Sequence, residues 1–129
     1  MFIPEGFNTI APYFVVEEAE VLIEFLKSAF DGVEVGRHLR DGIIANAQIK
    51  IGDSTVMISE ANEHSKVTQG SYYLYVENAD ESIKKAVESG GELLMEAVDM
   101  DYQDRQGGVK DPAGNTWWVS QRLVDEPYY

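Results

Sequence analysis

Apolar residues between Ala19 and Phe30 recur at the three- and four-residue spacing of an amphipathic helix. The apolar positions are Ala19, Leu22, Ile23, Leu26, Ala29 and Phe30, and the pattern stops at Asp31-Gly32. A narrower stripe at Ala79, Ile83, Ala86 and Val87 is followed by Gly90-Gly91, which resembles a helix terminator. The pattern predicts two helices, of which the second packs more loosely or more peripherally.

Three strand candidates follow each predicted helix. In the first half they are residues 33–39, 43–51 and 54–61, separated by turn signals at Arg40-Asp41-Gly42 and Gly52-Asp53. In the second half they are residues 92–98, 107–110 and 115–121, with "DMDYQDRQG" as a long polar loop and "DPAG" as the last turn. Each half therefore ends in a predicted three-stranded segment.

The two halves are related by an internal repeat. A shift of 60 residues places "YFVVEEAEVLI", from Tyr13, over "YLYVENADESI", from Tyr73, with five identical positions: Tyr13/Tyr73, Val16/Val76, Glu17/Glu77, Ala19/Ala79 and Ile23/Ile83. Each copy is typical of an alternating strand that leads into a helix with an acidic start. We predict an α+β fold of one domain, residues 1–129, made of two βαβββ units at 7–61 and 71–123 and joined by the polar linker 62–70.

Charge and composition narrow the range of partners. Ten basic and 23 acidic residues give a formal net charge of −13, which disfavours nucleic acid and anionic membrane surfaces. The same charge either attracts a cationic ligand or only keeps an acidic protein soluble. The chain has no cysteine, which excludes disulfides and thiolate chemistry. It has no apolar run long enough to cross a bilayer and no secretory signal, so we expect a cytoplasmic protein.

The turn "DPAGN", residues 111–115, at the end of a duplicated βαβββ unit resembles the vicinal oxygen chelate superfamily. This superfamily contains glyoxalases, bleomycin-resistance proteins, fosfomycin-resistance proteins and extradiol dioxygenases. The resemblance extends from Phe7 to about Leu123. It implies that each unit forms a half-barrel of curved mixed sheet, and that two half-barrels enclose a ligand cavity, commonly within a homodimer.

The resemblance also implies where a metal would be bound. Metal enzymes of the superfamily take four ligands, usually His and Glu, from the opening and last strands of each half. In this chain the corresponding residues are Ala11, Met57, Ser71 and Trp118. Such metals need imidazole or carboxylate donors, and these four side chains offer one hydroxyl. We therefore expect neither a metal nor another cofactor, and the resemblance favours the metal-free members that are similar to bleomycin-resistance proteins.

The candidate ligand-binding residues are mostly aromatic, and the sequence singles out no catalytic residue. Trp118 occupies the position of a metal-binding carboxylate, and strand alternation separates it from Trp117, which is expected to face the opposite layer. Alternation also places Tyr73 and Tyr75 on one face of their strand and Tyr72 on the other. The candidates are Trp118, Tyr73, Tyr75, Tyr13, Tyr102, Arg105 and His38.

Two of these candidates have alternative interpretations. Arg105, in the "DR-GG" stretch that the family resemblance includes, would clamp a ligand anion or pair with Asp104 or another nearby acid. His38 would line the mouth of the cavity or be an ordinary strand histidine. His38 and His64 are the only histidines, and they lack the spacing and the flanking carboxylates of a metal site.

Three functions fit the sequence. The first is a metal-free protein that binds a small molecule, such as a cationic or planar aromatic antibiotic, and sequesters it. The second is a glyoxalase-like, metal-dependent lyase, isomerase or dioxygenase whose ligands lie at other positions. The third is a dimeric structural or regulatory module without a pocket. In each case we expect a homodimer, because two half-barrels expose strand edges and a broad concave face.

Overall fold

The computed structural model describes all 129 residues and contains ten regular elements. The first half consists of β1 (Tyr13–Val16), α1 (Ala19–Phe30), β2 (Val33–Arg40), β3 (Ile43–Ile51) and β4 (Ser54–Glu60). The second half consists of β5 (Ser71–Tyr75), α2 (Ala79–Glu88), β6 (Glu92–Asp99), β7 (Asp104–Lys110) and β8 (Thr116–Arg122). The predicted α+β fold of two βαβββ units is confirmed.

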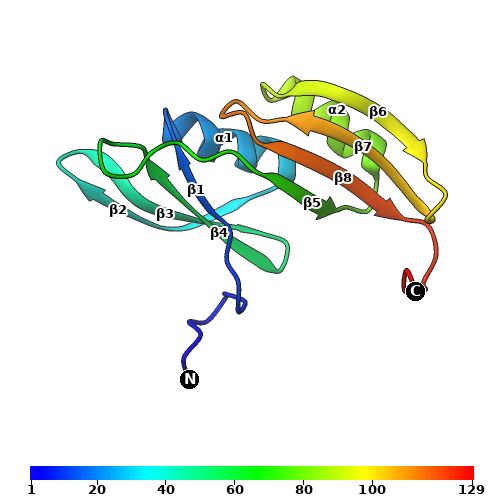
Figure 1. Ribbon diagram of the computed structural model, residues 1–129, viewed down its shortest axis with the longest axis horizontal. Helices are drawn as coiled ribbons and strands as arrows, with labels where there is room; N and C mark the ends of the chain where they lie inside the picture. Colours follow the sequence, from blue (N-terminus) through cyan, green and yellow to red (C-terminus); the bar gives the residue numbers. More distant parts are fainter.

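Each unit forms its own four-stranded mixed sheet. The strand orders are β1-β4-β3-β2 and β5-β8-β7-β6, hereafter sheets A and B. In each sheet the opening strand pairs in parallel with the last strand, and the other pairs are antiparallel. Figure 1 shows the two sheets side by side, with both helices packed along one side of them. The opposite surface of each sheet, turned away from the helices, is called its open face below.

The two units share one hydrophobic core between the sheets and the helices. Its 20 residues come from α1, α2 and strands of both sheets. The Trp117 ring of sheet B lies 5.9 Å from the Phe14 ring of β1 and 5.2 Å from the Phe30 ring of α1. Such aromatic contacts stabilise the packing between the two units by more than the burial of their surface area alone. The units are therefore packed together as one domain.

The register of the strands follows the repeat seen in the sequence. Tyr13 pairs with Met57 in sheet A, and Tyr73 pairs with Trp118 in sheet B. Met57 is thus the structural counterpart of Trp118, so the 60-residue shift of the opening strands becomes 61 in the last strands. The equivalence that the sequence predicted for these two positions is confirmed.

Both helices are fixed at their first turns by the last strand of their own unit. The Glu60 carboxylate accepts hydrogen bonds from the backbone amides of Glu18 and Ala19, both at 2.9 Å. In the second unit the Gln121 side chain accepts from the Ala79 amide at 3.0 Å. First-turn amides have no partner inside the helix, so these acceptors stabilise both helix starts, and Asn78 adds a local cap to α2 by accepting from the Glu81 amide at 3.1 Å.

Two segments differ from the sequence-based prediction or extend it. The polar stretch Asp104–Gln106, expected to be part of a loop, is the first half of β7, which pairs with β8 along its whole length. The C-terminal residues after Arg122 form no strand, and they turn back onto sheet B. No helix in the structure has the length and apolar character needed to span a bilayer.

Candidate functional site

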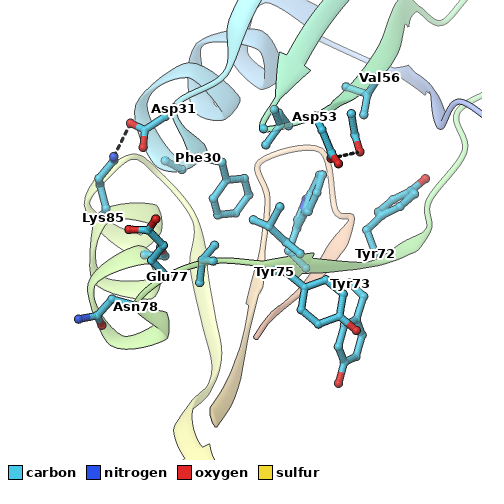
Figure 2. Close-up of a pocket in the computed structure, with 18 of the residues that line it drawn as sticks. Phe30, Asp31, Asp53, Val56, Tyr72, Tyr73, Tyr75, Glu77, Asn78 and Lys85 are labelled. Atoms are coloured by element: carbon cyan, nitrogen blue, oxygen red, sulfur yellow. Dashed lines mark hydrogen bonds and ion pairs between the residues drawn. The ribbon is translucent and has the colours of Figure 1, made fainter. Parts of the chain in front are cut away.

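The open face of sheet B gathers most of the aromatic candidates. Phe14, Tyr72 and Trp117 point to the core, so alternation turns Tyr73, Tyr75 and Trp118 to the open face. Figure 2 shows the rings of Tyr73 and Tyr75 on the opposite side of β5 from Tyr72. The rings of Tyr73 and Tyr75 lie 5.4 Å apart and remain about half exposed. They form an aromatic surface that is accessible in the single chain.

The two tryptophans lie on opposite faces of β8, as alternation predicts. Trp117 is 4% exposed, and its indole nitrogen donates a hydrogen bond to Asp111 at 2.8 Å. Trp118 lies against the backbone of β7 at Gly108, where an added Cβ would come within 2.7 Å of the indole ring. Glycine at position 108 therefore allows the indole to lie close to the sheet, as part of the open face.

A fully buried carboxylate, Asp104, lies at the far end of this face. One of its oxygens accepts hydrogen bonds from Ser120 at 3.0 Å and from Tyr128 at 2.6 Å. Its other oxygen accepts from Arg122 at 3.0 Å. A buried charge is tolerated only when it is paired and hydrogen-bonded, and three donors meet that requirement here.

The electrostatics of Asp104 follow from these contacts. Burial alone would raise the pKa of Asp104, but the hydrogen bonds from Tyr128, Arg122 and Ser120 outweigh burial and lower the pKa below its ordinary value. The hydrogen bond to Asp104 raises the pKa of Tyr128, and the Tyr75 hydroxyl adds to that effect. At neutral pH the site therefore holds an ionised carboxylate and a protonated phenol.

Gln106 forms a second polar centre beside Asp104. Its side-chain oxygen accepts a hydrogen bond from the Tyr73 hydroxyl at 2.8 Å and another from the Tyr102 hydroxyl. Burial raises the pKa of Tyr73, and the hydrogen bond with Tyr102 adds to the rise, so Tyr73 stays a donor at neutral pH. The structure thus brings Tyr73, Tyr75, Tyr102 and Trp118 together on one surface, with Asp104 and Gln106 as its polar groups.

The other three candidates lie elsewhere. Arg105 is on the helix side of β7, where its guanidinium pairs with Asp80 of α2 at 2.7 Å and with Asp99 at 3.0 Å. It does not pair with Asp104. Of the two interpretations of Arg105, the structure therefore shows the ion pair, with Asp80 and Asp99 as the acids. Tyr13 and His38 lie on the open face of sheet A, opposite Met57 and Asn46. They belong to the surface that is equivalent to the Trp118 surface in the other unit.

A pocket of about 700 Å³ lies between the two units, and Tyr73 and Tyr75 of the aromatic surface are among the residues that line it. Phe30, Tyr72 and Trp117 are among its aromatic walls, and Figure 2 shows Phe30 turned toward its interior. Its polar lining includes four carboxylates and one amine: Asp31, Asp53, Glu77, Glu81 and Lys85. The Lys85 amine is held by Asp31 at 2.7 Å, as the dashed line in Figure 2 marks. The pocket is acidic, and it does not include Trp118.

The side chains do not fit a catalytic divalent metal. No group of three or more His, Cys, Asp or Glu side chains is placed to hold one ion. The four positions implied by the resemblance remain Ala11, Met57, Ser71 and Trp118, and Asp104 already binds Arg122, Ser120 and Tyr128. This donor set lacks the imidazole and free carboxylate groups that such metals require.

Comparison with known proteins places this geometry in a family. The model of the Glyoxalase/Bleomycin resistance protein/Dioxygenase superfamily matches residues 6–119. The chain belongs to this superfamily. The resemblance noted in the sequence is therefore confirmed, and the superfamily includes both binding proteins and enzymes.

Individual proteins are similar to this chain in sequence or in fold. An uncharacterized protein of Mycobacterium bovis is 29% identical over 124 residues, which cover 87% of this chain and 82% of that protein. The crystal structure of TioX from Micromonospora sp. ML1 has a TM-score of 0.76 at 20% identity and covers 91% of this chain and 99% of that chain. A gene product of Arabidopsis thaliana has a TM-score of 0.70 at 22% identity, covering 88% of this chain and 98% of that chain.

Sequence reasoning missed the polar half of the site. Gln106, Ser120, Arg122 and Tyr128 were not among the candidates, and Asp104 was considered as a charged residue near the pocket rim and as a partner for Arg105. Alternation within "DRQGG" would have shown Asp104 and Gln106 on one face, had the stretch been read as strand. Nothing in the sequence indicates that Tyr128 returns to that face.

Proposed function

We propose that this protein is a metal-free small-molecule binding protein that sequesters a planar aromatic compound on the open face of sheet B. The observation that carries the proposal is the cluster of Tyr73, Tyr75, Tyr102 and Trp118 around the buried acceptors Asp104 and Gln106. Binding sites of this kind are mostly apolar and aromatic, with a few polar groups that orient the ligand.

The exposure of these rings supports a binding role rather than a packing role. Tyr73, Tyr75 and Tyr102 are 45%, 56% and 40% exposed in the single chain, although each hydroxyl has a partner. Hydrogen-bonded phenols lose little further freedom when a ligand stacks on them, so their surface is preorganised. Planar rings are the ligands that gain most from such a surface.

Charge favours a ligand that carries a positive group. The net charge of −13 produces a field that attracts cations, and the acidic pocket between the units adds four carboxylates against one lysine. A cation that reaches the aromatic surface also gains cation–π attraction. We therefore expect cationic planar compounds to bind more tightly than anionic ones.

A second copy of the chain would complete the site. The open face of sheet A presents Tyr13, Met57 and His38, and the equivalent face of sheet B presents Tyr73 and Trp118. In a homodimer, sheet A of one copy would face sheet B of the other and enclose the ligand between them. This arrangement supports a role for Tyr13 and His38 as walls contributed by the partner.

The test uses three probes of known charge and shape. We expect proflavine, a planar cation, to quench tryptophan fluorescence and to raise the melting temperature of the wild type. Fluorescein, a planar anion, and spermine, a cation without rings, should have much smaller effects. Trp118→Ala should weaken proflavine binding by about 1–3 kcal/mol, as for an aromatic anchor. Phe2→Ala, which removes a ring that is 93% exposed, is the matched control.

Several outcomes would contradict the proposal. Equal affinity for proflavine in the wild type and in Trp118→Ala would remove the open face as the site. Loss of binding in Glu81→Lys alone, at the rim of the pocket between the units, would move the site there. About one equivalent of zinc, nickel, manganese or iron per purified chain would favour the alternative of a metal-dependent lyase, isomerase or dioxygenase.

A further inference from the structure

The C-terminal segment, residues 123–129, ends on the site itself. The chain leaves β8 at Arg122, and the Leu123 amide donates to the Gln103 carbonyl at 2.9 Å. The Arg122 guanidinium then donates to the carbonyls of Glu126 at 2.8 Å and Pro127 at 3.3 Å. One arginine on the open face therefore holds the segment turned back at the end of sheet B, where Figure 1 marks the C-terminus.

This fold places the phenol of Tyr128 over Asp104. The hydroxyl donates to the Asp104 carboxylate at 2.6 Å and shares a 2.7 Å hydrogen bond with the Tyr75 hydroxyl. The Tyr128 ring lies 4.3 Å below the Arg122 guanidinium and packs edge-on against Tyr102, with ring centroids 6.4 Å apart. Every one of these contacts is made by the ring or by its hydroxyl.

Apart from these backbone hydrogen bonds, the rest of the segment makes few buried contacts. Leu123 is 42% exposed, Asp125, Glu126 and Tyr129 are exposed, and the half-buried Val124 is not part of the hydrophobic core, so no apolar side chain anchors the segment there. A segment with few buried contacts opens at low free-energy cost. Asp104, in contrast, needs the contact with Tyr128. When Tyr128 leaves, one buried carboxylate oxygen of Asp104 loses a hydrogen-bond donor, which costs free energy unless another donor takes its place.

We infer that Tyr128 is an internal ligand, which marks a subsite for a neutral hydroxy-aromatic ring and is displaced when such a ring binds. This inference rests on the proposed function and names its ligand class. The incoming hydroxyl donates to Asp104 and Tyr75, and the ring stacks below Arg122 as the Tyr128 ring does. Because Arg122 disfavours a positive ring there, any cationic group of the ligand lies elsewhere on the aromatic surface.

The first experiment measures the affinity for 2-naphthol by fluorescence in three proteins. Tyr128→Ala vacates the subsite and should bind 2-naphthol about tenfold or more tightly than the wild type, because the ligand no longer competes with Tyr128. Tyr129→Ala, which removes the neighbouring, fully exposed phenol, should bind as the wild type does. Equal or weaker binding in Tyr128→Ala would overturn the inference.

The second experiment tests the hydroxyl with a matched probe. In the Tyr128→Ala background, 2-methoxynaphthalene has the ring but no donor, and it should bind about tenfold more weakly than 2-naphthol. Adding Tyr75→Phe, or Asp104→Asn if that protein folds, should reduce this preference. If Tyr128→Ala does not prefer 2-naphthol, or if Tyr75→Phe leaves that preference unchanged, then Asp104 and Tyr75 do not recognise the hydroxyl of the ligand.

A third measurement needs no ligand and separates the two proposals. Tyr128→Phe keeps the ring and loses the hydroxyl, so hydrogen exchange at residues 123–129 should rise by about tenfold relative to Tyr129→Ala. Unchanged exchange would mean that the hydroxyl does not hold the segment, which overturns the inference. If proflavine binding still requires Trp118 in that case, the proposed function survives the failure.

Discussion

Trp117 and Trp118 are adjacent in the chain but contribute to different properties of the molecule. Trp117 is buried among Phe14, Phe30 and Tyr72, and its indole satisfies the buried Asp111 carboxylate. Trp118 lies half-buried on the open face. Two adjacent residues of β8 thus belong to different parts of the molecule: Trp117 to the core between the two units, and Trp118 to the surface proposed to bind ligand.

This difference predicts the stability of two variants. Trp117→Ala should lower the free energy of unfolding by about 3–5 kcal/mol, since it leaves a cavity and removes the only donor to one buried oxygen of Asp111. Trp118→Ala should cost clearly less, because its ring is only half-buried. Urea denaturation of both variants gives the comparison. A larger loss in Trp118→Ala would mean that the two faces of β8 have been assigned the wrong way round.

The lowered pKa of Asp104 predicts part of the decrease in the free energy of unfolding at acid pH. Its pKa is lowered in the folded protein, so its charged form stabilises the fold above the unfolded pKa of about 4. That contribution is lost as the pH falls from about 4 through the lower folded pKa. Unfolding free energies measured between pH 5 and pH 2 should therefore fall more steeply in the wild type than in Asp104→Asn. Parallel curves would show that Asp104 titrates alike in both states.

At the scale of elements, the pattern of apolar and polar residues was sufficient to predict most of the helices and strands. The helix α1 spans Ala19–Phe30, as its apolar spacing predicts, and both three-stranded segments occur where turn signals separate them. The start of β7 was missed because Asp104 and Gln106 are polar residues that are nevertheless buried on the open face. The hydrogen-bond partners of Asp104, which are Ser120, Arg122 and Tyr128, lie 16 to 24 positions away in the chain. A local pattern does not contain that information.

The start of α1 gives a prediction for one element. Glu18 has a left-handed backbone (φ 55°) and provides no side-chain cap, so the carboxylate of Glu60 takes that role from β4. Glu60→Ala removes the acceptor from two amides and should lower the free energy of unfolding by about 1–2 kcal/mol. Glu63→Ala, in the exposed part of the linker, is the control for the lost charge. Equal effects of the two substitutions in urea denaturation would exclude the capping role.

At the scale of the whole molecule, the internal repeat explains both the fold and the site. Duplication gives two equivalent open faces, with Tyr13 and Met57 on one and Tyr73 and Trp118 on the other. The polar groups differ, because the position 60 residues before Asp104 is the apolar Ile44, which belongs to the shared hydrophobic core. The sequence revealed the equivalence of the units. It did not reveal that only sheet B carries a buried carboxylate, since Asp104 takes one of its three side-chain hydrogen bonds from the folded C-terminal segment.

The open faces lead to a prediction for the assembly. Tyr13 is 47% exposed on sheet A, and Tyr73 and Tyr75 are similarly exposed on sheet B. Apolar surface of this kind on a sheet is usually covered by another layer, and a symmetric dimer that buries about 800 Å² per chain would cover both faces. We expect the wild type to sediment as a homodimer at micromolar concentration.

A matched pair of variants locates the dimer interface. Tyr13→Lys places a charge on the open face of sheet A and should weaken dimerisation by about tenfold or more, because the lysine must be desolvated there. Val21→Lys adds the same charge at an equally exposed position, 46%, on the outer side of α1 and should leave the dimer intact. Sedimentation velocity over a concentration series distinguishes the two. A wild type that stays monomeric, or equal dissociation in both variants, would show that the open faces do not pair, and the ligand surface would then be complete within one chain.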